Sequence, residues 1–209
     1  MAAERPDPQP WRTLESRTVY SDRWITLRSD TVETARGGVV SPFHVLEFRD
    51  WVATVAITPA DEIVLVREYR HGAGTVIHGL PAGVADAAEP PAETARRELA
   101  EETGYTAAAL IQLPGMYANA ANQTNRAWHF LAHGARLAGA TNFDPNEDIA
   151  TELADFPDFY RRLREGEIWM TGLHMAAVHQ AAGHILAGAV PELAGLRARL
   201  AASLGLGVG

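Results

Sequence analysis

Four charged side chains lie close together in one stretch of the sequence: Arg97, Glu98, Glu101 and Glu102. On a helix, residues three and four positions apart are neighbours, so Glu98 would lie beside both Glu101 and Glu102. Three carboxylates in one patch repel each other unless cations lie among them, and Mg²⁺ and Mn²⁺ prefer oxygen ligands. The pattern therefore favours a divalent metal site. A solvent-exposed, salt-bridged helix face is the alternative that this segment alone leaves open.

The residues on either side of this patch decide between the two interpretations. Gly83 is followed by five residues and Glu89, and then by seven residues and the run Arg-Glu-Leu-Ala-Glu-Glu-Thr-Gly-Tyr at positions 97–105. This spacing resembles the Nudix box, which has glycine, glutamate and an Arg-Glu-aliphatic-any-Glu-Glu-any-Gly sequence at these intervals. Every position that the box restricts to one residue type is matched. Only Tyr105 departs from it, because it stands where the box has an aliphatic residue.

The resemblance to the Nudix family implies a metal site and assigns roles to its residues. The backbone oxygen of Ala82 and the carboxylates of Glu98 and Glu102 would be the principal ligands of Mg²⁺ or Mn²⁺. Glu101 would be a further ligand or a group that orients water. Arg97 would hold the acidic side chains together. Metal ions held there would polarise phosphoryl oxygens and lower the pKa of a bound water.

Residues outside the box resemble one group of Nudix enzymes, the ADP-ribose and ADP-sugar pyrophosphatases. Residues 67–72, Arg-Glu-Tyr-Arg-His-Gly, resemble a strand end in which an arginine, here Arg70, contacts the phosphates of the substrate. The fixed fork of donors on a guanidinium suits this role. Glu147 stands where these relatives have an acidic loop residue that binds metal or activates water. The catalytic residues implied by the resemblance are Glu98, Glu101, Glu102 and Glu147.

The segment after the box departs from these relatives. Where they have Ser-Pro-Gly followed by an acidic residue, residues 117–125 contain amides, which cannot accept a proton from water at neutral pH. Glu147 and Glu101 are the two alternatives for the group that activates water. The expected reaction is hydrolysis of the diphosphate bond of ADP-ribose or an ADP-sugar to AMP and a sugar phosphate. The alternatives are another substrate (a GDP-sugar, a dinucleoside polyphosphate or a coenzyme) and a nucleotide-sensing module without catalysis.

The helix that carries the acidic patch is the clearest element of the chain. Residues 91–103 begin with Pro91, which suits a first helical turn, and are followed by Gly104, which is free to adopt the positive φ of a helix end. One apolar stripe should face a sheet. It consists of Ala92, Ala95, Leu99 and Thr103.

The other elements follow from apolar periodicity and turn residues. Strands are predicted for residues 19–35, 39–48, 51–58, 62–68, 107–113, 127–137 and 149–156, and helices for residues 157–164, 171–187 and 191–204. Residues 72–83 read as loop-rich. This order predicts a mixed α/β sandwich. The resemblance specifies a Nudix α/β/α sandwich (residues 49–209) with an N-terminal arm and β extension (residues 1–48) that would build a homodimer.

Composition excludes several other classes of protein. The 209 residues contain no cysteine, so disulfides, thiolate metal sites and thiol nucleophiles are excluded, and a cytoplasmic location is expected. The net charge of −8 gives no basic footprint for nucleic acid, and no apolar run is long enough for a membrane span. The first 14 residues are expected to be a loose arm. His174 and His179, five positions apart on one predicted helix, are interpreted as core or interface residues rather than a metal pair.

Overall fold

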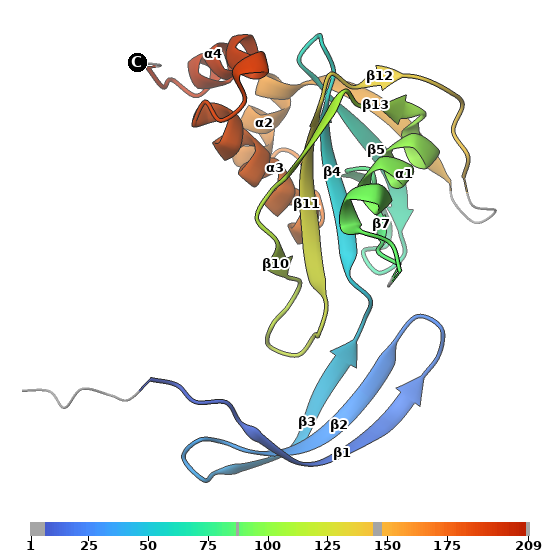
Figure 1. Cartoon of the computed structure of the whole chain (residues 1–209), viewed down its shortest axis with the longest axis vertical. Coiled ribbons are helices and arrows are strands. Elements are labelled where there is room, and N and C mark those ends of the chain that lie inside the picture. Colours follow the sequence, from blue (N-terminus) through green and yellow to red (C-terminus); the bar gives the residue numbers. More distant parts are fainter. Residues whose placement is uncertain (1–6, 87, 144–147, 208–209) are drawn as a thin grey trace, which may run out of the picture. The chain divides into compact units, whose positions relative to one another are not determined.

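The computed structural model describes residues 7–86, 88–143 and 148–207, which form two compact units (Figure 1). Unit 1 contains the described residues up to Arg49 together with Tyr117–Asn125, and unit 2 contains the rest. Unit 1 is an antiparallel sheet in which β2 (Thr26–Glu33) lies between β1 (Arg12–Ser21) and β3 (Val39–Glu47). The predicted strand over residues 39–48 is thereby confirmed.

β1 corrects two predictions. The sequence pattern predicts a loose arm as far as Leu14 and one strand over residues 19–35, and both predictions are wrong. All ten residues of β1 are exposed, so no alternation of buried apolar side chains marks it in the sequence. The break before β2 is stabilised by Asp22, whose carboxylate accepts hydrogen bonds from the backbone N–H groups of Trp24 (2.8 Å) and Ile25 (2.9 Å).

Unit 2 is built on a mixed sheet in the order β10-β11-β4-β5-β13, with β6 paired to β5, β7 to β4 and β9 to β11. β11 runs parallel to β4, whereas the β4–β5, β4–β7, β5–β6, β5–β13 and β9–β11 pairs are antiparallel. A short β8–β12 ladder stands apart. The bounds are β4 (Trp51–Ile57), β5 (Glu62–Arg70), β6 (Thr75–Gly79), β7 (Ala82–Val84), β8 (Tyr105–Thr106), β9 (Ala109–Gln112), β10 (Met116–Tyr117), β11 (Arg126–His133), β12 (Arg136–Leu137) and β13 (Ile149–Asp155).

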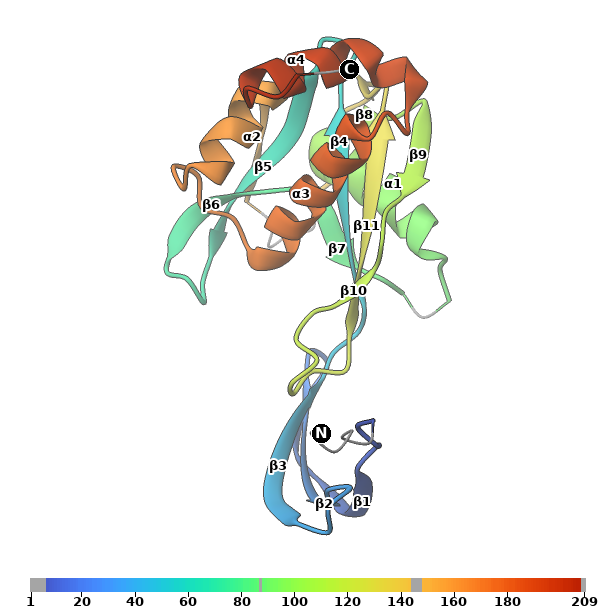
Figure 2. The same cartoon turned by 90° about the vertical axis from the view of Figure 1, so that its left-hand side faces the viewer.

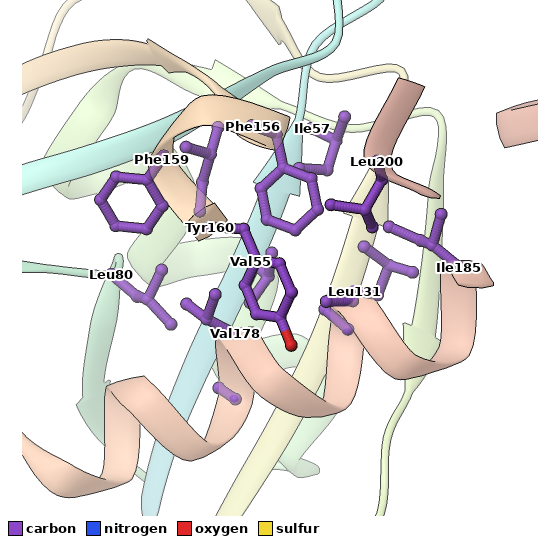
Figure 3. Packing of buried hydrophobic residues seen from close by; sticks show 14 of the residues in the cluster. Val55, Ile57, Leu80, Leu131, Phe156, Phe159, Tyr160, Val178, Ile185 and Leu200 are labelled. Carbon is purple, nitrogen blue, oxygen red and sulfur yellow. The ribbon is translucent and has the colours of Figure 1, made fainter. Parts of the chain in front are cut away.

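Helices cover both faces of this sheet, so that β4 is buried on both sides. Val55 and Ile57 pack in a cluster with α2 (Phe156–Arg164), α3 (Gly172–Leu186) and α4 (Ala194–Ser203), as Figure 3 shows. Val52 and Ala56 pack in clusters that contain buried residues of α1 (Pro91–Thr103) instead. The predicted α/β/α sandwich is confirmed, and Figure 2 shows α3 running along the sheet beside β11. Within the described chain, no helix is both long and apolar enough to cross a membrane.

α1 has the predicted bounds and orientation. Gly104 adopts φ 74° and donates its N–H to Ala100 O at 2.8 Å, which ends the helix. Ala95, Leu99 and Thr103 of the predicted stripe are buried. Elsewhere, the single strand predicted over residues 127–137 is wrong, because Gly134 (φ 67°) separates β11 from β12. The loop-rich prediction for residues 72–83 missed β6 and part of β7.

Candidate active site

Two carboxylates of α1 reach the backbone of β7. Glu102 is only 6% exposed, and its Oε2 accepts a hydrogen bond of 2.9 Å from the N–H of Ala82. Glu98 lies against Gly83 so closely that a Cβ atom at position 83 would stand 2.0 Å from Glu98 Oε1. Glycine is therefore the residue that permits this contact. The helix and the strand together bring Glu98 and Glu102 to the peptide groups of residues 82–83.

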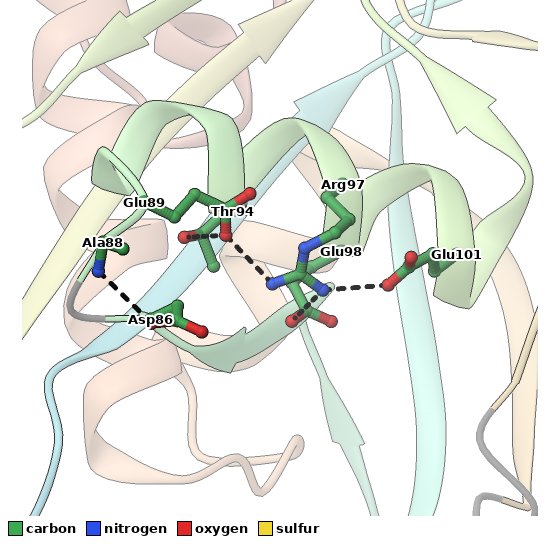
Figure 4. Close-up of polar contacts among 7 residues, drawn as sticks. All are labelled: Asp86, Ala88, Glu89, Thr94, Arg97, Glu98 and Glu101. Atoms are coloured by element: carbon green, nitrogen blue, oxygen red, sulfur yellow. Dashed lines mark hydrogen bonds and ion pairs between the residues drawn. The ribbon is translucent and has the colours of Figure 1, made fainter.

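Arg97 is hydrogen-bonded to three acidic side chains, two of α1 and one that precedes it, as Figure 4 shows. Its Nη1 lies 2.9 Å from both Glu98 Oε1 and Glu101 Oε2, and its Nη2 lies 3.2 Å from Glu89 Oε2. Burial would lower the pKa of Arg97, but hydrogen bonds and charge interactions with these carboxylates raise it above its usual value. The hydrogen bonds of Glu89 with Thr94 and Arg97 in turn lower the pKa of Glu89. The expected role of Arg97 in holding the acidic cluster together is confirmed.

A pocket of about 280 Å³ lies in unit 2, beside the backbone of β7 and the first turn of α3. Its polar side chains include Arg70, His129 and His174, and Arg70 also forms an ion pair of 2.9 Å with Glu68. The predicted phosphate-binding arginine therefore lines the same pocket as Ala82 and Gly83, the two residues that Glu98 and Glu102 approach. The lining consists of Trp51, Val52, Ala53, Arg70, Ala82, Gly83, Val84, Ala127, His129, Thr171, Leu173 and His174.

The two histidines of this pocket are buried and neutral. Burial lowers the pKa of His174 to about 3, with smaller contributions from the nearby Arg70 and His129. Burial likewise lowers the pKa of His129, against the effect of its hydrogen bond with Gln180. His174 is buried, as predicted, and also lines the pocket, whereas the sequence analysis missed His129. The only signal for His129 is a polar residue within the apolar run of residues 127–132.

Comparison with known proteins identifies the family. A family model described as "NUDIX domain" matches residues 48–171, which is more than half of the chain. The chain belongs to the Nudix family. A second model, described as "Nucleoside diphosphate sugar hydrolase N-terminal domain", matches residues 11–46.

Two relatives of this Nudix hydrolase are named ADP-ribose pyrophosphatase. An "ADP-ribose pyrophosphatase" of Mycobacterium tuberculosis is 33% identical over 160 residues, which cover 76% of this chain and 77% of the relative. An "ADP-ribose pyrophosphatase" of Bacillus subtilis is 33% identical over 106 residues, 51% of this chain and 57% of the relative. A crystal structure titled "ADP compounds hydrolase" superposes with a TM-score of 0.74 at 22% identity, over 88% of this chain and 98% of the other. At that identity the structural match supports the Nudix fold alone.

Nudix hydrolases generally depend on a divalent metal. The oxygen atoms of Glu98, Glu102 and the peptide groups of β7 fit such an ion. Carboxylates and a peptide carbonyl are the oxygen ligands that hard divalent cations prefer. Among the described residues, no group of three or more Asp, Glu or His side chains is arranged to hold a metal ion, and both Glu98 and Glu101 are hydrogen-bonded to Arg97. Glu147 lies outside the described residues. The structure thus brings Glu98 and Glu102 together at residues 82–83.

We expect Gly83→Ala to lower kcat/KM by about tenfold, because a small displacement of a catalytic group is costly. The new methyl group would lie 2.0 Å from Glu98 Oε1 and 2.2 Å from Glu98 Cδ, so the carboxylate must move. The measurement is steady-state hydrolysis together with a thermal melt. Gly183→Ala in α3 is the control, since a Cβ there meets nothing within 4 Å. Unchanged kinetics for Gly83→Ala would show that the position of Glu98 at Gly83 is irrelevant to catalysis.

Proposed function

We propose that this Nudix hydrolase is a magnesium-dependent pyrophosphatase that cleaves ADP-ribose or an ADP-sugar into AMP and a sugar phosphate. The observation that carries the proposal is the meeting of two kinds of group at residues 82–83. Arg70 lines the same pocket as these two residues, and Glu98 and Glu102 of α1 approach them. A phosphate-binding guanidinium and oxygen ligands for a metal around one pocket suit a diphosphate substrate. The names of the relatives and the match to the sugar hydrolase N-terminal domain support the substrate class.

Each residue of the proposed site would have a distinct role in the reaction. The backbone oxygen of Ala82 and the carboxylates of Glu98 and Glu102 would hold Mg²⁺, with Glu101 as a further ligand. When bound, the metal supplies charge neutralisation and a water of lowered pKa. Arg70 binds phosphoryl oxygens and orients the diphosphate. Water adds to one phosphorus and the bridging oxygen leaves with the other phosphate, so that ADP-ribose and water give AMP and ribose 5-phosphate.

We propose Glu147 as the residue that activates the water or binds metal, with Glu101 as its alternative. Both carboxylates must be tested directly, and the pair Glu147→Gln and Glu101→Gln does so at saturating magnesium across pH. We expect Glu147→Gln to lower kcat by at least about tenfold, since a positioned base contributes this much or more. Glu101→Gln should lose less, because its carboxylate is engaged by Arg97. If only Glu101→Gln loses turnover, the loop assignment is wrong and catalysis belongs to α1 alone.

The experiment that tests the proposed function is a substrate screen with magnesium. Nucleoside diphosphate derivatives are incubated with the protein, and the phosphate monoesters released are measured. The proposal expects ADP-ribose or an ADP-sugar to have the highest kcat/KM and AMP to be a product. Preference for a GDP-sugar, a dinucleoside polyphosphate or a coenzyme would overturn the substrate assignment. Binding without turnover of any derivative would favour a nucleotide-sensing module.

We also propose that unit 1 is a dimerisation element. Every residue of β1 is exposed, and its apolar side chains include Leu14, Val19 and Tyr20. Large apolar side chains that are exposed close together mark an interaction site more often than free surface. Sedimentation or light scattering of the purified chain should give twice the mass of 22.6 kDa. A monomer at micromolar concentration would contradict this assignment.

A further inference from the structure

One residue that lines the pocket beside β7, His129, has a buried ring nitrogen without a hydrogen-bond partner among the described residues. His129 is 0% exposed, and its Nε2 atom has no hydrogen-bond partner among the described residues. Its Nδ1 lies 2.9 Å from Gln180 Oε1, which is an acceptor, so Nδ1 carries the ring hydrogen. Nε2 of the neutral ring is therefore a bare lone pair. Buried polar atoms of this kind are normally satisfied, so an unpartnered one in a pocket indicates a ligand contact.

His174, on the first turn of α3, complements this acceptor. Its Nδ1 accepts a hydrogen bond of 3.1 Å from the N–H of Leu80, so the hydrogen of the neutral ring is on Nε2. His129 and His174 line the same pocket, and His129 is close enough to lower the pKa of His174. These two lining residues thus carry one acceptor, Nε2 of His129, and one donor, Nε2 of His174. A hydroxyl group both donates and accepts, and it matches such a pair.

The position of the pocket identifies which part of a substrate reaches these histidines. Arg70, Ala82 and Gly83 belong to its lining, so it adjoins the place that the proposed function gives to the diphosphate. In a nucleoside diphosphate sugar, the group bonded to the diphosphate is a sugar on either side. The nucleobase is separated from the diphosphate by the ribose of the nucleoside. The volume of about 280 Å³ is below the usual range of pockets for whole drug-sized ligands, which favours a single sugar over a nucleoside.

We propose that His129 is a substrate-binding residue whose Nε2 accepts a hydrogen bond from a hydroxyl group of the sugar next to the diphosphate, with His174 donating to the same sugar. This inference rests on the proposed function and deepens it. It makes the pocket a site that recognises hydroxyl groups. A substrate without the recognised hydroxyl would leave the buried acceptor unpaired. An enzyme can discriminate strongly in kcat/KM against such a substrate.

The kinetic test combines a variant with altered substrates. His129→Phe keeps a ring at position 129 but removes the acceptor, and ADP-ribose is compared with analogues that each lack one hydroxyl of either ribose. We expect His129→Phe to lower kcat/KM for ADP-ribose by about tenfold. One deoxy analogue should cost the wild type a similar factor and cost the variant nothing further, since both changes remove the same contact. His179→Phe is the matched control, because His179 bonds to Tyr160 and is absent from the pocket lining.

Two results would overturn the inference. One is an equal loss by His129→Phe on ADP-ribose and on every deoxy analogue, which indicates a structural role. The other is that His129→Phe loses nothing further on an analogue that lacks the exocyclic amine of the nucleobase. That result would place the nucleobase, and not a sugar, in this pocket. Failure of the proposed function is a different result, namely that the wild type does not cleave any nucleoside diphosphate sugar.

A second measurement does not depend on the folding of a variant. The imidazole ¹⁵N resonances of the wild-type protein are recorded while ribose 5-phosphate is added. We expect the Nε2 resonance of His129 to shift from the position of a free lone pair towards that of a hydrogen-bonded one, and the resonances of His179 to stay in place. A saturating sugar phosphate that leaves His129 Nε2 unshifted would contradict the inference.

Discussion

Removal of divalent cations is expected to abolish the hydrolysis of ADP-ribose by this Nudix hydrolase. The groups that approach residues 82–83 from α1, Glu98 and Glu102, are both anionic, and the chain as a whole has a net charge of −8. Without a cation these carboxylates would repel the diphosphate, and the arginine of the pocket, Arg70, is already paired with Glu68. Excess chelator should reduce turnover to background, and added Mg²⁺ or Mn²⁺ should restore it.

A thermal melt in the same chelator separates loss of catalysis from loss of folding. The packed core of unit 2 and the ion pairs of Arg97 do not require a metal, so the melting temperature should change little. Recovery of turnover upon addition of metal, with an unchanged melt, would support a catalytic ion. Full turnover in excess chelator would contradict the metal role of Glu98 and Glu102.

The elements that could be predicted from the sequence have strong local signals. α1 was predicted with its observed bounds because Pro91 and Gly104 mark its ends and Ala95 and Leu99 give it one apolar stripe. β4 and β5 were recognised because both are apolar runs around a tight turn. The predicted metal ligands Glu98 and Glu102 could be proposed from the sequence because their spacing along one helix is itself the signal. Short-range patterns were therefore sufficient for the acidic part of the site.

The parts that were missed depend on contacts between distant residues. β1 has no buried side chain, so its pairing with β2 leaves no periodic pattern. The role proposed for His129 depends on its hydrogen bond with Gln180, 51 residues later, because this bond determines which ring nitrogen carries the hydrogen. Such relations arise from tertiary packing, and one sequence without a fold does not show them.

Glu102→Gln is expected to lower kcat by about a hundredfold or more while the fold stays intact, which is the scale of losing one strong electrostatic contact in a transition state. Glu102 is nearly buried, and its Oε2 accepts the N–H of Ala82 at 2.9 Å. A glutamine keeps an oxygen for this hydrogen bond and nearly the same shape, so β7 should remain docked on α1. It loses the negative charge that would bind the metal.

The measurement is kcat at saturating substrate over a range of magnesium concentrations, together with a thermal melt of each protein. Since the variant weakens a metal ligand, it should need more magnesium than the wild type, and excess magnesium should restore only part of the rate. Glu93→Gln is the matched control, because Glu93 lies on the same helix, is exposed and takes no part in the Arg97 network. It should keep wild-type kinetics. If Glu102→Gln melts as the wild type does and loses less than about tenfold in kcat, Glu102 is not a principal metal ligand.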